Sequence, residues 1–149
     1  MVEEMKDEEL HSILVPVDGS EPSRRALHKA VYIAGHCGAS LTLLNVVDLN
    51  KEINSFEQVS TGGYVPSELK VKGYELLTEM VRDVPRNMPL RTVVKIGDPA
   101  KTTVEFCEEE KFDLIIIGSR GYSRLKQMIL GSVSQYVILR CTCPVMIVR

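Results

Sequence analysis

The chain has 149 residues, of which 44% are hydrophobic and 26% charged, and its formal net charge is −2. This composition is ordinary for one globular domain that buries a core without metals or disulfides, and the weak charge excludes a general attraction to nucleic acid or to an anionic membrane. No stretch approaches the roughly 20 apolar residues of a membrane span, and the acidic tail at 1–11 does not resemble a secretory signal. We therefore expect one cytoplasmic domain covering residues 1–149.

The first part of the chain alternates apolar runs with amphipathic stretches. Residues 13–17 are apolar and rich in branched side chains, which is typical of a buried strand. Ser20 and Pro22 then indicate a helix start, because Ser can cap a helix and Pro is tolerated in its first turn. Apolar residues at helical spacing carry this helix to Gly35–Gly38, and a second strand is expected at 41–47.

An irregular segment at 48–64 precedes further elements of the same kind. We expect a flexible loop there, because so long a connection is uncommon in a compact domain. It could act as a flap over a ligand or be an insertion without a role. The remaining expected elements are a helix at 66–83, a strand at 92–96, a helix at 99–110, a strand at 113–117, a helix at 132–141 and a strand at 145–148. Strands separated by helices predict βαβ units, and therefore an α/β fold with an open parallel sheet.

A glycine motif lies between the fourth expected strand and the last helix. It reads Gly118-Ser-Arg-Gly121, nine further residues, then Gly131-Ser132. Glycines at the end of a parallel strand let backbone N–H groups approach a ligand, and a helix start adds unpaired N–H groups and the positive end of its dipole. The motif therefore predicts a phosphate-binding site. Its spacing differs from the P-loop, G-x4-G-K-[ST], and from the dinucleotide fingerprint, G-x-G-x-x-G.

With this motif the chain resembles the universal stress protein family, in its ATP-binding branch. The resemblance also rests on four segments in the family's order, Val15–Ser20, Leu43–Asp48, Gly97–Pro99 and Cys143–Val148. It implies a single-domain, open parallel five-stranded sheet in the order 3-2-1-4-5, with helices on both faces, of the adenine nucleotide alpha-hydrolase-like type. In that order the switch point lies between strands one and four, and the residues that end them, Asp18 and Gly118, would flank a ligand.

The resemblance also implies the residues of a nucleotide site. Asp18 would accept hydrogen bonds from the ribose hydroxyls or the adenine edge, and Val46 would offer backbone groups and an apolar wall to the base. The full set comprises Pro16, Val17 and Asp18 around the adenosine, Val46 at the base, Gly118, Ser119, Arg120 and Gly121 under the ribose and phosphates, and Gly131, Ser132, Val133 and Ser134 around the phosphates. The last four would donate from backbone N–H groups and hydroxyls. Val17 departs from the family pattern, which often has a small hydroxyl residue there.

Simpler structural roles stay open for several of these residues. Asp18 could only complete the turn before the first helix, and Gly118 could be a plain strand-to-loop turn. Ser132 could act as an N-cap, alone or together with phosphate binding. The basic side chains of the glycine loop, Arg120, Arg124 and Lys126, could screen ligand charge or be solvated.

The expected function is that of an ATP-binding regulatory protein in a stress response. Occupancy by ATP or another adenine nucleotide would order the glycine loop and alter a surface that an unidentified protein partner reads. Mg²⁺ or Mn²⁺ could be bound mainly by the phosphates of the nucleotide. We expect neither a metal site formed by protein side chains nor a catalytic residue. A slow ATPase or phosphotransferase using the same site is the alternative, and a dimerising module without a ligand is a third. The resemblance further implies a homodimer through the edge strand Val145–Val148.

The four cysteines lack the spacing of a metal site. Cys141 and Cys143 are close in sequence, but we expect two free thiols rather than a functional disulfide, because intracellular thiols stay reduced. The three histidines are scattered along the chain, and we expect structural or solvent-exposed roles for them.

Overall fold

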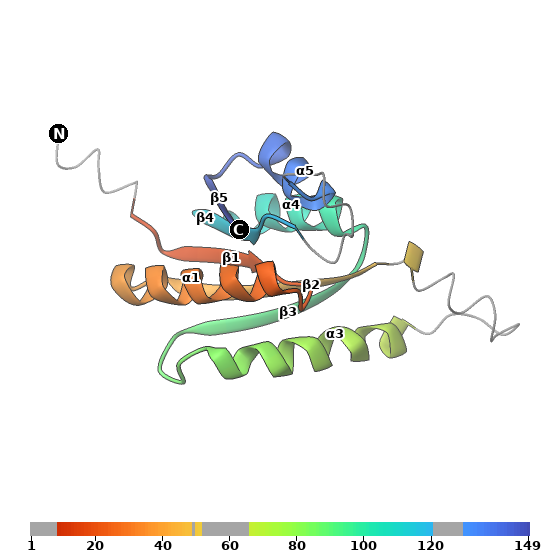
Figure 1. Ribbon diagram of the computed structural model, residues 1–149, viewed down its shortest axis with the longest axis horizontal. Helices are drawn as coiled ribbons and strands as arrows, with labels where there is room; N and C mark the ends of the chain where they lie inside the picture. Colours follow the sequence, from red (N-terminus) through yellow and green to blue (C-terminus); the bar gives the residue numbers. More distant parts are fainter. Residues whose placement is uncertain (1–8, 49, 52–65, 121–129) are drawn as a thin grey trace, which may run out of the picture.

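The computed structural model describes residues 9–48, 50–51, 66–120 and 130–149. Its strands form one parallel sheet in the order β3-β2-β1-β4-β5, which confirms the α/β fold and the strand order that the resemblance implied (Figure 1). The elements, in chain order, are β1 Ser12–Pro16, α1 Glu21–Cys37, β2 Ser40–Asp48, α3 Pro66–Met80, the 3-10 turn η2 Val81–Asp83, β3 Leu90–Gly97, α4 Pro99–Glu110, β4 Leu114–Gly118, α5 Ser132–Arg140 and β5 Val145–Val148.

Helices cover both faces of the sheet. α1 and α3 pack on one face and α4 and α5 on the other (Figure 1). The alternation of side chains along the strands divides the core in the same way, since Ile13 and Val15 of β1 cluster with α1 and Leu14 clusters with Phe106 of α4. These three β1 side chains are fully buried, and burial of such a side chain contributes about 1.5–3 kcal/mol.

The second predicted helix ends earlier than the sequence pattern indicates. It was expected over 66–83, but α3 ends at Met80 and Val81–Asp83 form a single 3-10 turn. Val84 is already extended, with φ −101° and ψ 130°. It precedes Pro85, whose ring disfavours helical backbone at the residue before it, and this explains the early end.

Parallel pairing brings the carboxyl ends of all the strands to one edge of the sheet, on the right in Figure 1. α1, α4 and α5 follow β1, β3 and β4, so these helices start at the same edge. β1 lies at the centre, between β2 and β4, which makes its carboxyl end the middle of that edge. Within the described ranges, no helix has the length and apolar character needed to cross a membrane.

Candidate functional site

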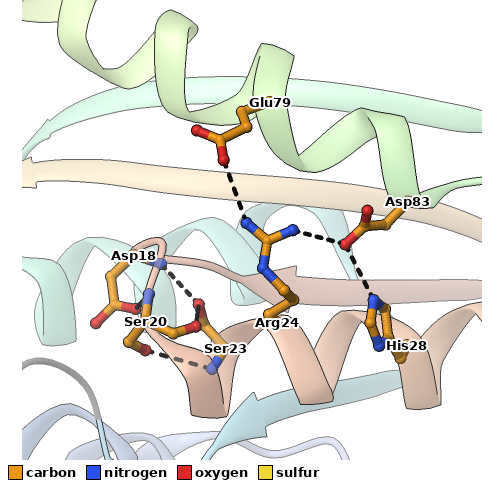
Figure 2. Close-up of polar contacts among 7 residues, drawn as sticks. All are labelled: Asp18, Ser20, Ser23, Arg24, His28, Glu79 and Asp83. Atoms are coloured by element: carbon orange, nitrogen blue, oxygen red, sulfur yellow. Dashed lines mark hydrogen bonds and ion pairs between the residues drawn. The ribbon is translucent and has the colours of Figure 1, made fainter.

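The chain leaves β1 through a tight polar turn at Asp18. Val17 N still donates to Leu44 O of β2 at 2.9 Å, so strand pairing continues up to the turn. Asp18 Oδ1 then accepts a hydrogen bond from Ser20 N at 2.9 Å (Figure 2). Asp18 therefore does complete the turn before α1, as one reading of the sequence expected. Its second oxygen, Oδ2, has no hydrogen-bond partner among the residues that the structure describes, and the side chain is half-buried.

The start of α1 is closed by its own side chains. Ser20 is the N-cap, and its Oγ accepts from Ser23 N at 3.3 Å, which confirms the predicted cap. Ser23 Oγ in turn donates to Ser20 O at 2.9 Å, and both serines are buried (Figure 2). α4 is closed in the same manner, because Asp98 Oδ2 accepts from Lys101 N at 2.9 Å. Neither helix start offers all of its N–H groups to a ligand.

The start of α5 is different, because no side chain of the described residues caps it. Its N-cap is Gly131, in extended backbone with φ −69° and ψ 162°, and not Ser132, which is the first helical residue. The alternative that Ser132 is the cap is therefore wrong. Gln135 N donates to Gly131 O at 3.0 Å, which is the first hydrogen bond of the helix. The N–H groups of Ser132, Val133 and Ser134 come before it and therefore have no acceptor within the helix. Three backbone donors and the positive end of the helix dipole thus meet at this point.

Other donors of the motif are used inside the protein. Gly131 N donates to Ser119 O at 2.6 Å, and Ser119 N donates to Val148 O of β5 at 2.7 Å. The Ser134 hydroxyl donates to Gly118 O at 2.8 Å and is buried. In this conformation the Gly131 N–H and the Ser134 hydroxyl, which the resemblance implied as phosphate donors, instead hold the end of β4 against α5.

Gly118 is required by packing as well as by its place in the motif. A Cβ atom on Gly118 would lie 2.7 Å from the backbone carbon of Pro22 and 2.8 Å from its oxygen. Contacts this short with backbone atoms cannot be relieved by a side-chain rotation, so a larger residue would push α1 away from β4. Gly118 is neither a plain turn nor only an opening toward a ligand, because it lets the first helix sit directly against the end of the fourth strand.

The other predicted site residues are divided between the core and the edge. Val17 is only 4% exposed and its side chain belongs to the core cluster under α1, so the valine at this position is accounted for by packing. Val46 is half-buried and packs against the cluster on the α4 side, whereas Pro16 is buried and Arg120 is exposed. Gly121 and most of the expected flap at 48–64 lie outside the described residues; Asp48 is the last residue of β2, and residues 50–51 are helical.

One residue of this edge was missed by the sequence interpretation. Asn45 is a buried polar residue of β2, and its Nδ2 donates to Val17 O at 2.8 Å, one residue before Asp18. It fixes the carbonyl from which the Asp18 turn departs. The signal was present as a single amide inside the apolar run of residues 43–47.

A polar network holds α1 to the other helix on its face. Arg24 donates to Asp83 Oδ2 at 2.7 Å and lies 3.5 Å from Glu79, while His28 Nε2 is 3.0 Å from the same Asp83 oxygen (Figure 2). The hydrogen bond from His28, followed by the bond and charge of Arg24, lowers the pKa of Asp83 below its usual value. This network ties the first turns of α1 to α3 and η2.

The chain is similar to known proteins over nearly its whole length. Residues 9–149 match the family described as the universal stress protein family. Universal stress protein YxiE of Bacillus subtilis is 36% identical over 149 aligned positions, covering 93% of this chain and 99% of that protein. The solved structure of protein MJ0577 of Methanocaldococcus jannaschii has a TM-score of 0.72 at 29% identity, over 94% of this chain and 96% of that chain. A universal stress protein solved in complex with cAMP also has a TM-score of 0.72, at 24% identity over 95% and 98% of the two chains.

Proposed function

Because the chain belongs to the universal stress protein family, we propose that it is a stress-response protein that binds an adenine nucleotide, ATP in the first place. Nucleotide occupancy would then control how it meets a protein partner. The nucleotide would lie across the carboxyl edge of the sheet, between the Asp18 turn and the start of α5. The cytoplasmic location stays a prediction.

The open start of α5 is the observation that carries this proposal. Three successive N–H groups, those of Ser132, Val133 and Ser134, have no intrahelical acceptor and no side-chain cap among the residues that the structure describes. Backbone N–H groups at a helix start can bind phosphate oxygens without help from a positively charged side chain. The bond from Gly131 N to Ser119 O places the end of β4 beside them, so a polyphosphate could lie between the two.

The sugar and base would occupy the part of the edge formed by β1 and β2. Asp18 keeps one carboxylate oxygen in its own turn and leaves Oδ2 for a ribose hydroxyl. Val46, half-buried on β2, would contact the base. The cAMP complex of a protein with this fold supports an adenine nucleotide as the ligand class.

A divalent ion would be held mainly by the phosphates. Within the part of the chain that the structure describes, there is no group of three His, Cys, Asp or Glu side chains able to hold a metal. Mg²⁺ commonly keeps several waters and binds through substrate phosphates, and Mn²⁺ could take the same place. The exposed Arg120 would screen part of the ligand charge.

The regulatory step would use the segment between Gly118 and Gly131. Both of its ends are fixed by hydrogen bonds to β5 and α5, so a phosphate bound at those ends would act on the segment directly. Residues 121–129 lie outside the described part, and the effect on a partner is a proposal only.

A homodimer through β5 is part of the same proposal. Among the described strands β5 pairs only with β4, and its residues Val145–Val148 are all half-buried in the single chain. Leu139 of the neighbouring α5 is 79% exposed. A second copy would cover this apolar edge. Sedimentation at micromolar concentration should give twice the 16.7 kDa chain mass, and a monomer mass would contradict the dimer.

The proposal is tested by removing one backbone donor from α5. Ser132→Pro deletes the N–H at the first helical position, where proline is tolerated, and Gly131 already has the extended backbone that a following proline requires. We expect ATP to bind about 10- to 100-fold more weakly by calorimetry, which corresponds to the roughly 1.5–3 kcal/mol of a hydrogen bond to a charged group.

Ser132→Ala is the matched control, because it removes the hydroxyl and keeps the N–H. Its affinity should stay close to that of the unchanged chain. Equal losses in both variants would assign binding to the hydroxyl, and no ATP uptake by the unchanged chain at millimolar ligand would refute the function. Steady ADP release in the same samples, abolished by Ser132→Pro, would instead support the slow ATPase.

A further inference from the structure

A group of three thiols lies on the α4 side of the sheet, apart from the nucleotide edge. Cys107 of α4 and Cys143, just before β5, have their Sγ atoms 3.4 Å apart. Cys141 packs against the same core cluster, close enough to both thiols to influence them. The fourth cysteine, Cys37, is exposed at the end of α1 on the other face. Within the described residues the group does not meet the requirements of a metal site.

We propose that Cys107 and Cys143 form a reversible disulfide, with a peroxide as oxidant, that links α4 to the start of β5. The sequence interpretation considered only the neighbours Cys141 and Cys143, whereas the structure brings together two thiols that are 36 positions apart. The inference does not depend on nucleotide binding.

The geometry needs little change for the bond to form. The two sulfur atoms are in van der Waals contact, and a disulfide at about 2.05 Å requires an approach of about 1.4 Å. Cys107 is fixed in a helix and only 3% exposed, but Cys143 lies in the irregular segment between α5 and β5 and is half-buried. We therefore expect Cys143 to make most of the movement.

An oxidant can reach the pair from one side. Both thiols line a cavity of about 600 Å³, whose other walls include Glu108, Lys111 and Thr142. In the first step Cys143 Sγ attacks one peroxide oxygen, the O–O bond breaks, and a sulfenic acid and one water form from H₂O₂. In the second step Cys107 Sγ attacks that sulfur, the S–O bond breaks, and a second water leaves. Two thiols and one H₂O₂ thus give one disulfide and two waters.

The surroundings make this a slow reaction with a stable product. The hydrogen bond with Cys107 and burial raise the pKa of Cys143, and burial raises the pKa of Cys141 to about 11. Few thiolates are present at neutral pH, so attack on peroxide is slow. A reduced state that is not stabilised as thiolate also favours the disulfide once it has formed. The pair would respond to sustained oxidation and remain reduced in an ordinary cytoplasm.

The experiment treats the intact protein with excess H₂O₂, blocks the remaining thiols by alkylation, and maps the peptides without reduction. We expect the unchanged chain to lose the free thiols of both Cys107 and Cys143 and to yield a linked peptide pair that contains these two residues. The oxidised monomer should melt about 10 °C higher than the reduced one, because the link closes a long loop in the unfolded chain. Dithiothreitol should reverse both changes.

Cys37→Ser and Cys143→Ser are the matched variants. Cys37→Ser should behave as the unchanged chain, whereas Cys143→Ser, at a half-buried position, should form no intramolecular link. A link between Cys141 and Cys143, oxidation confined to Cys37, or no loss of thiols after prolonged treatment would each overturn the proposal. The peptide map of the unchanged chain decides the matter even if a variant folds poorly.

Discussion

At the carboxyl edge of the sheet, α1 and α5 begin in opposite ways. α1 is closed by Ser20, whose Oγ accepts from the backbone, and by the Asp18 turn before it. α5 begins at Gly131, which has no side chain to accept. Both starts combine glycine with small polar residues in the sequence, yet only one leaves its donors open. The comparison teaches that unpaired backbone donors, rather than polar side chains near a helix start, identify a site for an anion.

The largest effect is expected where the two helix starts meet, at Gly118. Its Cβ position is 2.7 Å from the backbone of Pro22 in α1, and its carbonyl accepts from Ser134 of α5. Gly118→Ala should therefore lower the free energy of unfolding by about 3 kcal/mol, the upper range for overpacking. Urea unfolding measures this change in the free energy of unfolding. Gly35→Ala is the control, because its nearest atom would lie at 3.8 Å and alanine suits a helix better than glycine. A stable Gly118→Ala protein would refute the packing role.

The next experiment makes α5 resemble α1. Gly131→Asp places a carboxylate at the N-cap, where the backbone is already extended, so it should occupy the open donors and repel phosphate. We expect ATP affinity to fall about 100-fold, or about 2.7 kcal/mol, while the free energy of unfolding is unchanged or slightly higher. Calorimetry and urea unfolding measure the two quantities. Gly131→Asn caps without charge and should lose less affinity, and full binding by the Asp variant would place the phosphates elsewhere.

The opposite change opens the start of α1. Ser20→Ala removes the oxygen that accepts from Ser23 N, and the loss of such a cap costs about 1 kcal/mol of stability. Because this helix start is structural, the dissociation constant for ATP should not change. Ser20→Thr keeps the hydroxyl and should restore most of the stability. A variant that loses affinity but not stability would reverse the assignment of the two starts.

The smallest effect concerns the network that anchors α1 to η2. The pKa of Asp83 is lowered by His28 and then by Arg24, so its ionised form stabilises the fold above the usual carboxyl pKa. That contribution is lost as the pH falls through the lowered pKa, below about 4. Asp83→Asn should remove about 0.5 kcal/mol at pH 7, a typical value for a partly exposed pair. Its urea midpoint should converge with that of the unchanged chain toward pH 2, and a constant difference across this range would contradict the role.

The sequence predicted the fold well because hydrophobic periodicity determines it. Short apolar runs rich in branched side chains, such as 13–17, favour a buried strand, and Ser20 with Pro22 favours a helix start. The strand order came from the resemblance alone, since periodicity carries no information on which strands are neighbours. The early end of α3 was predictable in principle from Pro85, whose effect on the residue before it is local.

The site could be predicted only in outline. The glycine spacing predicted a site at the carboxyl ends of the strands, but it could not show that Gly118 is required by Pro22 of α1, which is distant in sequence. Nor could it show that the Ser134 hydroxyl donates its hydrogen bond to Gly118 O. Contacts of this kind depend on how two elements dock, and no local pattern records them. Asn45 was overlooked for the same reason, because its partner, Val17, follows another strand and is distant in sequence.

The central position of β1 has a consequence for how the protein is made. β1 pairs with β4, which joins Ile13 to Leu114, and Asp113 accepts hydrogen bonds from the backbone of His11 and Ser12. A chain emerging from the ribosome cannot pair β1 on both sides until the fourth strand has been synthesised, and contacts so distant in sequence form slowly. The open start of α5 is translated later still. If the proposed function holds, newly made chains would thus become able to take up nucleotide only after the first four strands and α5 have been synthesised.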